Sequence, residues 1–211
     1  SLMTIADVVY FSADNGVNGT ELWKSDGTDQ GTSMIMDINP GSGSSVPSHI
    51  TEAGGIIYFS ANDGIVGQEL WKTTGLSITT ELVKDIRNGS YGSYPGNFIE
   101  FNDKLYFSAG SFREDWEISR IELWTSSGTN ETTFRVGQDQ ELYTNPETIT
   151  IFGDQLFMSL STFITGWRNY ASCIWEGNSE LVANGLDDLW YCTTPLFEHW
   201  SDTNISEIED R

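Results

Sequence analysis

The feature that most constrains the fold is an internal repeat of about 48 residues. The segment YFSADNGVNGTELWKSDGT begins at Tyr10 and recurs as YFSANDGIVGQELWKTTG from Tyr58, 48 residues later. A third copy opens at Tyr106, again 48 residues on, and a more divergent fourth opens at Phe157, 51 residues after that. Self-similarity at a period of roughly 20 to 50 residues is typical of solenoids, propellers and arrays. The 211 residues therefore form one run of repeats in a single domain.

Prolines follow the same period and mark the unit boundaries. They stand at Pro47, Pro95, Pro146 and Pro195, with steps of 48, 51 and 49 residues. We expect four units, followed by a segment that is a tail, a cap of the fourth unit or the start of a fifth. The expected units are 1–46, 47–94, 95–145 and 146–194, and the last segment is 195–211.

Within one unit the local signals predict only strands and turns. In the second unit, HITEA, IIYFSA, QELWKT and ELVKDI are apolar or alternating runs separated by glycine-rich turns. Alignment on the repeat places Leu2 opposite Ile50, so the first unit contains its own innermost strand. Four antiparallel strands per repeat are typical of a β-propeller blade. We predict an all-β fold, a propeller of four-stranded antiparallel blades with four blades in this chain, either closed as a four-bladed ring or part of a larger one. An open ring would expose apolar faces and self-associate.

The charge balance excludes several classes of partner. The chain has 31 acidic and 10 basic side chains, a net charge of −21 and a sequence pI near 4.1. Phosphate would repel such a chain, so nucleic acid and anionic membrane surfaces are not expected partners. No window has the roughly 18 apolar residues of a transmembrane helix, so membrane insertion is not expected either. With 38% hydrophobic residues, including eight Trp, the chain has enough apolar material for a folded core.

The repeat also resembles a known family. ELWKSDGT with Gly31 and Thr32 after it, MDINPG, and the preceding YFSADNG resemble the ELWxxDGT repeat, found in tandem in large secreted or surface proteins, mainly bacterial. The resemblance is strong over residues 10–100, partial in the third unit and faint in the fourth, which has IWEGNSE. It implies a propeller-like repeat region located outside the cell or on its surface, and it supplies no catalytic residues. The start, SLMTIADVVYFS, has no signal-peptide pattern and begins in mid-repeat, which predicts a mature or excised segment of a larger extracellular protein.

Aromatic residues outside the repeated positions predict a ligand-binding face. Trp23, Trp71, Trp124 and Trp175 share one position of the repeat, which indicates packing between blades. In a four-stranded blade, the loop between the second and third strands and the connector to the next blade emerge on the same face. Aromatic and arginine side chains gather there, as a sugar-stacking or protein-binding surface requires. The predicted ligand-binding residues are Arg113, Trp116, Arg120, Trp167, Arg168 and Tyr170 in the expanded loops, with Tyr91, Tyr94, Tyr143 and Trp190 in the connectors. The alternative is that they anchor the loops.

The favoured function is non-catalytic extracellular recognition or adhesion, with a glycan or a protein as the ligand. One alternative is a passive spacer within a larger surface protein. Another is a glycoside-active propeller enzyme that uses Glu52 and Glu100, which occupy equivalent positions on the predicted innermost strands. No GxSxG, HExxH or phosphate-binding glycine loop is present, so no catalytic residue is assigned.

Calcium is the one cofactor that the sequence makes plausible, because oxygen-rich loops suit a hard cation. The candidate ligands are Asp14, Asp63, Asp26, Asp37 and Asp85, and the alternative is that these residues form turns.

The two cysteines form a candidate disulfide. Cys173 falls near the start of a predicted third strand and Cys192 in the connector after the fourth, two positions expected to be neighbours. The alternative is two reduced thiols.

Overall fold

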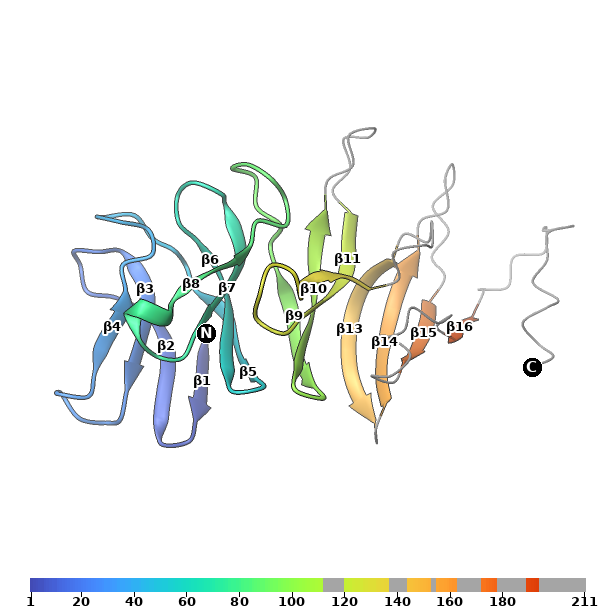
Figure 1. The fold of residues 1–211 in the computed structure, drawn as a ribbon, viewed down its shortest axis with the longest axis horizontal. Coiled ribbons are helices and arrows are strands. Elements are labelled where there is room, and N and C mark those ends of the chain that lie inside the picture. The colour runs from blue at the N-terminus through green and yellow to red at the C-terminus, as the bar shows by residue number, and fades with distance from the viewer. Residues whose placement is uncertain (112–119, 137–143, 153–154, 163–171, 178–188, 194–211) are drawn as a thin grey trace, which may run out of the picture.

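In the computed structural model the described residues are 1–111, 120–136, 144–152, 155–162, 172–177 and 189–193. They form four antiparallel sheets of four strands each, and within every sheet the strands follow one another in chain order. The all-β prediction is confirmed, and each sheet corresponds to one predicted unit, although the fourth sheet begins at Thr144, before the predicted start of unit 146–194 (Figure 1).

The strand boundaries follow the repeat. The first sheet is β1 (Leu2–Ile5), β2 (Val8–Asp14), β3 (Thr20–Ser25) and β4 (Ser33–Met36). The second is β5 (Ser48–Ala53), β6 (Ile56–Asn62), β7 (Gln68–Thr73) and β8 (Glu81–Lys84). The third is β9 (Gly96–Phe101), β10 (Lys104–Ser111), β11 (Arg120–Ser126) and β12 (Phe134–Arg135). The fourth is β13 (Thr144–Phe152), β14 (Gln155–Thr162), β15 (Ser172–Gly177) and β16 (Leu189–Thr193).

One short 3-10 helix, η1 (Ser77–Thr79), lies between β7 and β8 and was not predicted. It is the only helix of the described residues, and it is too short to cross a membrane.

The register of the two central strands is the same in all four sheets. Tyr10 lies opposite Lys24, Tyr58 opposite Lys72, Tyr106 opposite Thr125, and Phe157 opposite Glu176. Because side chains alternate across a strand, each sheet has two distinct faces. We call them the tyrosine face (Tyr10 and Leu22 in the first sheet) and the phenylalanine face (Phe11 and Trp23).

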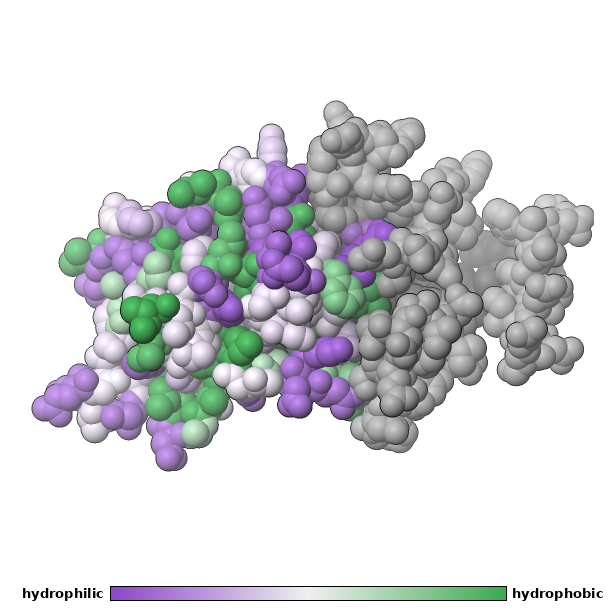
Figure 2. Space-filling model, in the orientation of Figure 1, coloured by the Kyte–Doolittle hydropathy of each residue, from purple (hydrophilic) through white to green (hydrophobic). Residues whose placement is uncertain are grey.

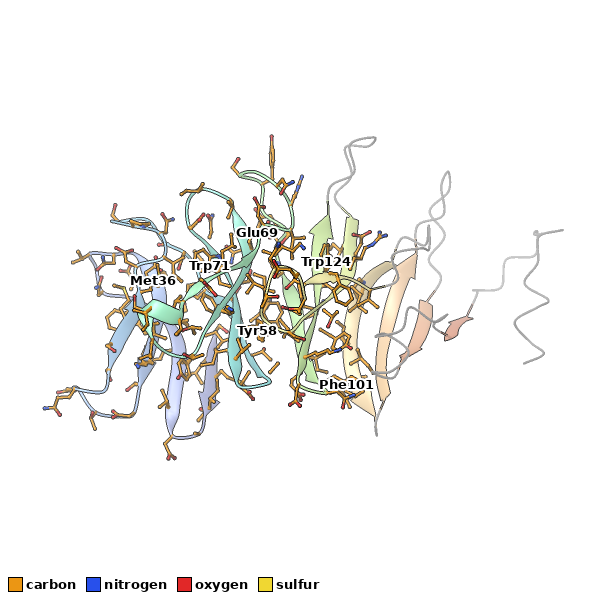
Figure 3. The ribbon with its side chains drawn as sticks, in the orientation of Figure 1. Met36, Tyr58, Glu69, Trp71, Phe101 and Trp124 are labelled. Atoms are coloured by element: carbon orange, nitrogen blue, oxygen red, sulfur yellow. The ribbon has the colours of Figure 1, made fainter. Side chains whose placement is uncertain are left out.

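The core consists of interfaces between consecutive sheets. The tyrosine face of the first sheet packs on the phenylalanine face of the second, and the second sheet packs on the third in the same way. Tyr106 and Leu123 of the third sheet pack with Leu156 of the fourth. Figure 3 shows Trp71 between the first two sheets and Tyr58 between the second and third. A single sheet cannot bury either of its faces, so each depends on its neighbour.

The sheets lie side by side along the long axis of the molecule, with the first and fourth far apart (Figure 1). The innermost strands meet in sequence, β1 with β5, β5 with β9 and β9 with β13. Among the described strands, extensive contacts between sheets join only consecutive sheets, so no closed four-sheet ring is observed.

Candidate recognition face

The loops between the second and third strands lie beside the connectors that lead to the next sheet. Asn18 in the β2–β3 loop donates from Nδ2 to Asp37 Oδ2 at 2.8 Å, and the Val46 backbone N–H donates to Thr20 O at 3.2 Å. In the second unit, Tyr94 N–H donates to Gln68 O at 3.0 Å. For these two units the predicted common face is confirmed. We call this surface, residues 14–19, 37–47, 62–67 and 85–95, the loop face.

Short polar side chains hold the loops of this face in shape. Asp14 Oδ1 accepts from Gly16 N–H at 2.7 Å, and Asn62 Oδ1 accepts from Gly64 N–H at 2.8 Å. Asp63 Oδ1 accepts from the backbone N–H groups of both Ile65 and Val66. These are the side-chain turns typical of Asn and Asp. The loops are therefore preformed by local hydrogen bonds.

In the first two units the glutamate of the ELW motif fastens the connector to its sheet. Glu21 is fully buried and accepts from the backbone N–H groups of Ile38, Asn39 and Ser45, and from the Ser45 hydroxyl. This role was missed by the sequence prediction, although Ser45 keeps its place 24 residues after the glutamate in both of the first two units.

The second unit repeats this arrangement with fewer donors. Glu69 accepts from Ile86 N–H at 3.1 Å, from Arg87 N–H at 3.2 Å and from the Ser93 hydroxyl. Burial raises the pKa of Glu69 to about 7, against the hydrogen bonds, which lower it. In the third sheet the partner of the motif glutamate is a charged side chain, with Arg135 Nη1 2.6 Å from Glu122 Oε1.

Two residues of the connectors adopt a costly backbone conformation. Val46 and Tyr94 occupy equivalent positions, each directly before a proline, and have φ of +49° and +51°. His49 and Asn97, three residues after Val46 and Tyr94 respectively, also have a positive φ, of +54° each. A left-handed backbone costs roughly 1–2 kcal/mol for a non-glycine residue, and such strain clusters at functional sites.

The strained residues are also solvent-exposed. Val46 is 55% exposed and Tyr94 is 70% exposed, and Val17, Ile65 and Tyr91 of the same face are exposed as well. Figure 2 shows hydrophobic surface at the loop ends of the sheets, among polar residues. The Arg87 guanidinium lies over the Tyr91 ring, 5.1 Å from its centroid. The described part of the loop face thus carries two exposed tyrosines with an arginine beside one of them.

The other predicted ligand-binding residues are placed as follows. Arg113, Trp116, Trp167, Arg168, Tyr170 and Tyr143 lie outside the described residues. Arg120 is the first residue of β11, opposite Ser111 of β10. The predicted place of Trp190 in a connector was wrong, because it lies within β16 opposite Trp175. The divergent fourth unit lacks a clear turn signal before this strand, so its start was placed too early in the chain.

Two of the four repeated tryptophans pack between sheets, as predicted. Trp71 and Trp124 are 7% and 8% exposed and belong to the first and second interfaces between sheets. Trp23 occupies the same position of the first sheet and is half-buried. Only the backbone of Trp175 is described, and it lies in register with the others.

Most of the aspartates proposed as calcium ligands form turns. Asp26 Oδ1 accepts from the N–H and the hydroxyl of Thr28, and these bonds hold its pKa below the ordinary value. Asp37 Oδ2 accepts from Asn18 and from Gly41 N–H. Asp85 lies directly after β8, where its charge adds to the rise in the pKa of Glu69. Within the described residues no three carboxylate, histidine or cysteine side chains gather as a metal site.

Glu52 and Glu100 each cap a hairpin turn. The Gly55 N–H donates to Glu52 Oε1 at 2.6 Å, and the Asp103 N–H donates to Glu100 Oε1 at 3.0 Å. Each carboxylate is therefore engaged by its own turn, β5–β6 or β9–β10.

The cysteines are neighbours in the backbone. Cys173 of β15 lies directly opposite Cys192 of β16. The expected place of Cys192 in a connector was wrong, for the same reason as for Trp190, and the disulfide stays a prediction.

Comparisons with known proteins do not identify a family for this chain. No family model and no curated protein matches the sequence. One solved structure that is similar is an α-L-arabinofuranosidase from Clostridium thermocellum, with 16% sequence identity and a TM-score of 0.35, over 85% of this chain and 68% of that one. At this TM-score the likeness carries no argument about the fold or the activity of the chain.

Proposed function

We propose that this chain is a non-catalytic recognition or adhesion module of a secreted or surface protein, and that it binds a glycan or a protein through the loop face. We further propose that its four sheets are blades of a β-propeller of the ELWxxDGT repeat type. The consecutive packing of the sheets and the sequential contact of their innermost strands support the second proposal.

The functional proposal rests on the backbone conformation and the solvent exposure of Val46 and Tyr94. Both are large, exposed side chains on a left-handed backbone, where glycine would be cheaper. The backbone is held there by hydrogen bonds from Val46 N–H to Thr20 O and from Tyr94 N–H to Gln68 O. A side chain kept in solvent at a cost in stability serves better as a ligand contact than as packing.

Tyrosine and arginine on a rigid scaffold suit both ligand classes. Tyr91 and Tyr94 offer ring faces for stacking, and Arg87 adds a cation beside Tyr91. Aromatic side chains and arginine are enriched in binding surfaces because they bury a large area at a low entropic cost. In a chain of net charge −21, such a cation is a local exception.

The proposal is tested by two experiments, a glycan-array screen and a pull-down of binding proteins from the natural surroundings of the protein. Each is done once with calcium and once with a chelator. We expect binding that falls at least about tenfold in Y94A and in Y91A, since an aromatic anchor contributes on the order of 2 kcal/mol. The matched control is I78A, which removes a 92%-exposed side chain outside the loop face. Equal loss in I78A, or unchanged affinity in both tyrosine variants, would contradict the proposal.

Two alternatives are distinguished by the same screen. A passive spacer gives no specific ligand in either format. A glycosidase releases sugar from a bound glycan and loses that activity in E52Q and E100Q, although both carboxylates are occupied by backbone turns. Loss of binding on chelation would assign the acidic loops to calcium.

A further inference from the structure

The phenylalanine face of the first sheet is uncovered, whereas its counterparts are buried. Phe59 and Phe107 are both 0% exposed, but Phe11, at the same position of the repeat, is only half-buried. The same difference separates Val9, Ala13 and Trp23 from their equivalents in the next two sheets, which are all buried. Among the described residues, Phe11 and Trp23 belong to none of the hydrophobic clusters between sheets, and the extensive contacts between strands do not join this face to another sheet.

The molecule itself shows what covers such a face. On the second sheet, the cover is the tyrosine face of the first, with Tyr10, Leu22 and Ile35 in one cluster with Phe59 and Trp71. On the third sheet, Tyr58, Leu70 and Val83 cover Phe107 and Trp124 in the same way. Burial raises the pKa of the covering Tyr58 to about 12, so this tyrosine stays protonated even above the ordinary phenol pKa of 10.

The covering tyrosine also contacts the turn that follows the ELW strand. A Cβ at Gly75 would lie 2.7 Å from the Tyr10 hydroxyl, and one at Gly128 would lie 3.2 Å from the Tyr58 hydroxyl. The equivalent Gly27 of the first sheet has nothing within 4 Å. This turn of the first sheet is therefore shaped for a tyrosine that no described residue supplies.

A lysine completes the first two covered interfaces, whereas the third sheet has Thr125 at this position. Lys24 Nζ donates to Gly75 O at 2.8 Å, and Lys72 Nζ donates to Gly128 O at 2.7 Å. These bonds join one sheet to the next and are charge-assisted, which makes them stronger than neutral ones. No described residue of another sheet makes this bond to Gly27 O.

The fourth unit does not carry the residues that this face requires. The register places Phe157 at the position of Tyr10 and Glu176 at that of Lys24. A glutamate there would bring a negative charge to a carbonyl oxygen, where the first two interfaces bring the positive charge of a lysine. Ring closure by the fourth unit, or head-to-tail pairing with a second copy of the chain, would therefore lack both specific contacts.

We infer that the phenylalanine face of the first sheet, with Phe11, Trp23 and the Gly27 turn, is a docking surface for one more repeat unit joined in series ahead of it. That unit carries tyrosine and lysine at the positions of Tyr10 and Lys24. It is joined in series because, at both covered interfaces, a connector runs from the covering sheet directly into the innermost strand of the covered one. This inference concerns a different surface from the loop face and does not depend on the proposed function.

The test duplicates residues 1–48 ahead of Ser1, which preserves the 48-residue spacing of the repeat. The added copy carries Trp23→Phe, so that the tryptophan it covers is the original one. We expect acrylamide quenching of Trp23, isolated by difference against a W23F version, to fall severalfold relative to the 211-residue chain. The thermal midpoint is expected to rise, and amides of β2 and β3 to exchange more slowly.

The matched control is the same duplication with Tyr10→Phe and Lys24→Glu in the added copy only, which reproduces the pair of the fourth unit. We expect less shielding of Trp23 and a smaller rise in the midpoint. Equal shielding by both added copies would overturn the inference, as would no shielding by either. The inference would also be overturned if Trp23 of the 211-residue chain were already shielded from acrylamide and the W23A substitution dissociated a dimer. A second copy of the chain would then cover the face.

Discussion

The central strands of the first and second sheets have similar sequences but not the same environment. Tyr10 to Thr28 and Tyr58 to Gly75 match at most positions, and their strands pair in the same register. Yet Phe59 is fully buried while Phe11 is half-buried, and Gly75 meets a tyrosine where Gly27 meets nothing. The difference shows that the burial of a residue in a repeat protein depends on the neighbouring unit, because each sheet packs one of its faces on the next sheet.

The largest expected effect comes from truncating the covered and uncovered phenylalanines. Phe59→Ala is expected to lower the free energy of unfolding by about 3–5 kcal/mol, since it leaves a cavity in a filled interface. Phe11→Ala is expected to cost about 1 kcal/mol, because less area is removed from contact. Urea denaturation measures both. Equal losses would mean that the face of the first sheet is covered in solution.

The next effect compares two glycines with the same backbone strain. Gly27 and Gly75 have φ of +90° and +87°, so alanine carries the same left-handed penalty at each. Only at Gly75 does the new methyl collide with the Tyr10 hydroxyl, which adds about 1–3 kcal/mol of overpacking. The measured quantity is the difference in unfolding free energy between G75A and G27A. A difference of zero would remove the tyrosine contact from the account of the interface.

A third prediction concerns the pH dependence that the buried carboxylate of Glu69 gives to stability. The folded state raises the pKa of Glu69 from 4.5 to about 7, so the folded state holds this proton more tightly than the unfolded chain. Stability is therefore expected to fall as pH rises from about 4.5 to 7 and to level off above that. The expected fall is on the order of 3 kcal/mol, since one pKa unit corresponds to about 1.4 kcal/mol.

The variant E69Q should lose this pH dependence, as measured by denaturation from acid to neutral pH. The matched variant E21Q keeps Glu69 and should retain it, although it is less stable overall. If E69Q follows the pH profile of the unmodified chain, another group is responsible for the slope.

The smallest effect concerns the lysine between sheets. Lys24→Met removes the hydrogen bond to Gly75 O and is expected to cost about 1 kcal/mol. Lys72→Met removes the matching bond to Gly128 O and is expected to cost a similar amount. Chemical denaturation of both variants gives the comparison. If neither loses stability, lysine is not what distinguishes a covered turn from an open one.

The parts of the fold that were predictable are those set by local sequence. The YFS and ELW runs alternate with glycine-rich turns, and the strands β5 to β8 begin and end within a few residues of the predicted segments. Predictions failed where the repeat is worn, since Trp190 and Cys192 lie in β16 and not in a connector. The loop face was predicted from topology and is confirmed in the first two units, but Val46 was overlooked because an isolated valine before a proline gives no sign of a positive φ.

The sequence by itself determined the number of units and the strands in each, because periodicity and turn chemistry act over a few residues. Only the tertiary structure decided which copy of a repeated residue is buried. Glu21 and Glu69 became buried acceptors because a connector 17 to 24 residues away folds back onto them. Phe11 and Phe59 differ in burial because only Phe59 has a neighbouring sheet packed against it. The sequence of a single unit does not specify which units lie beside it.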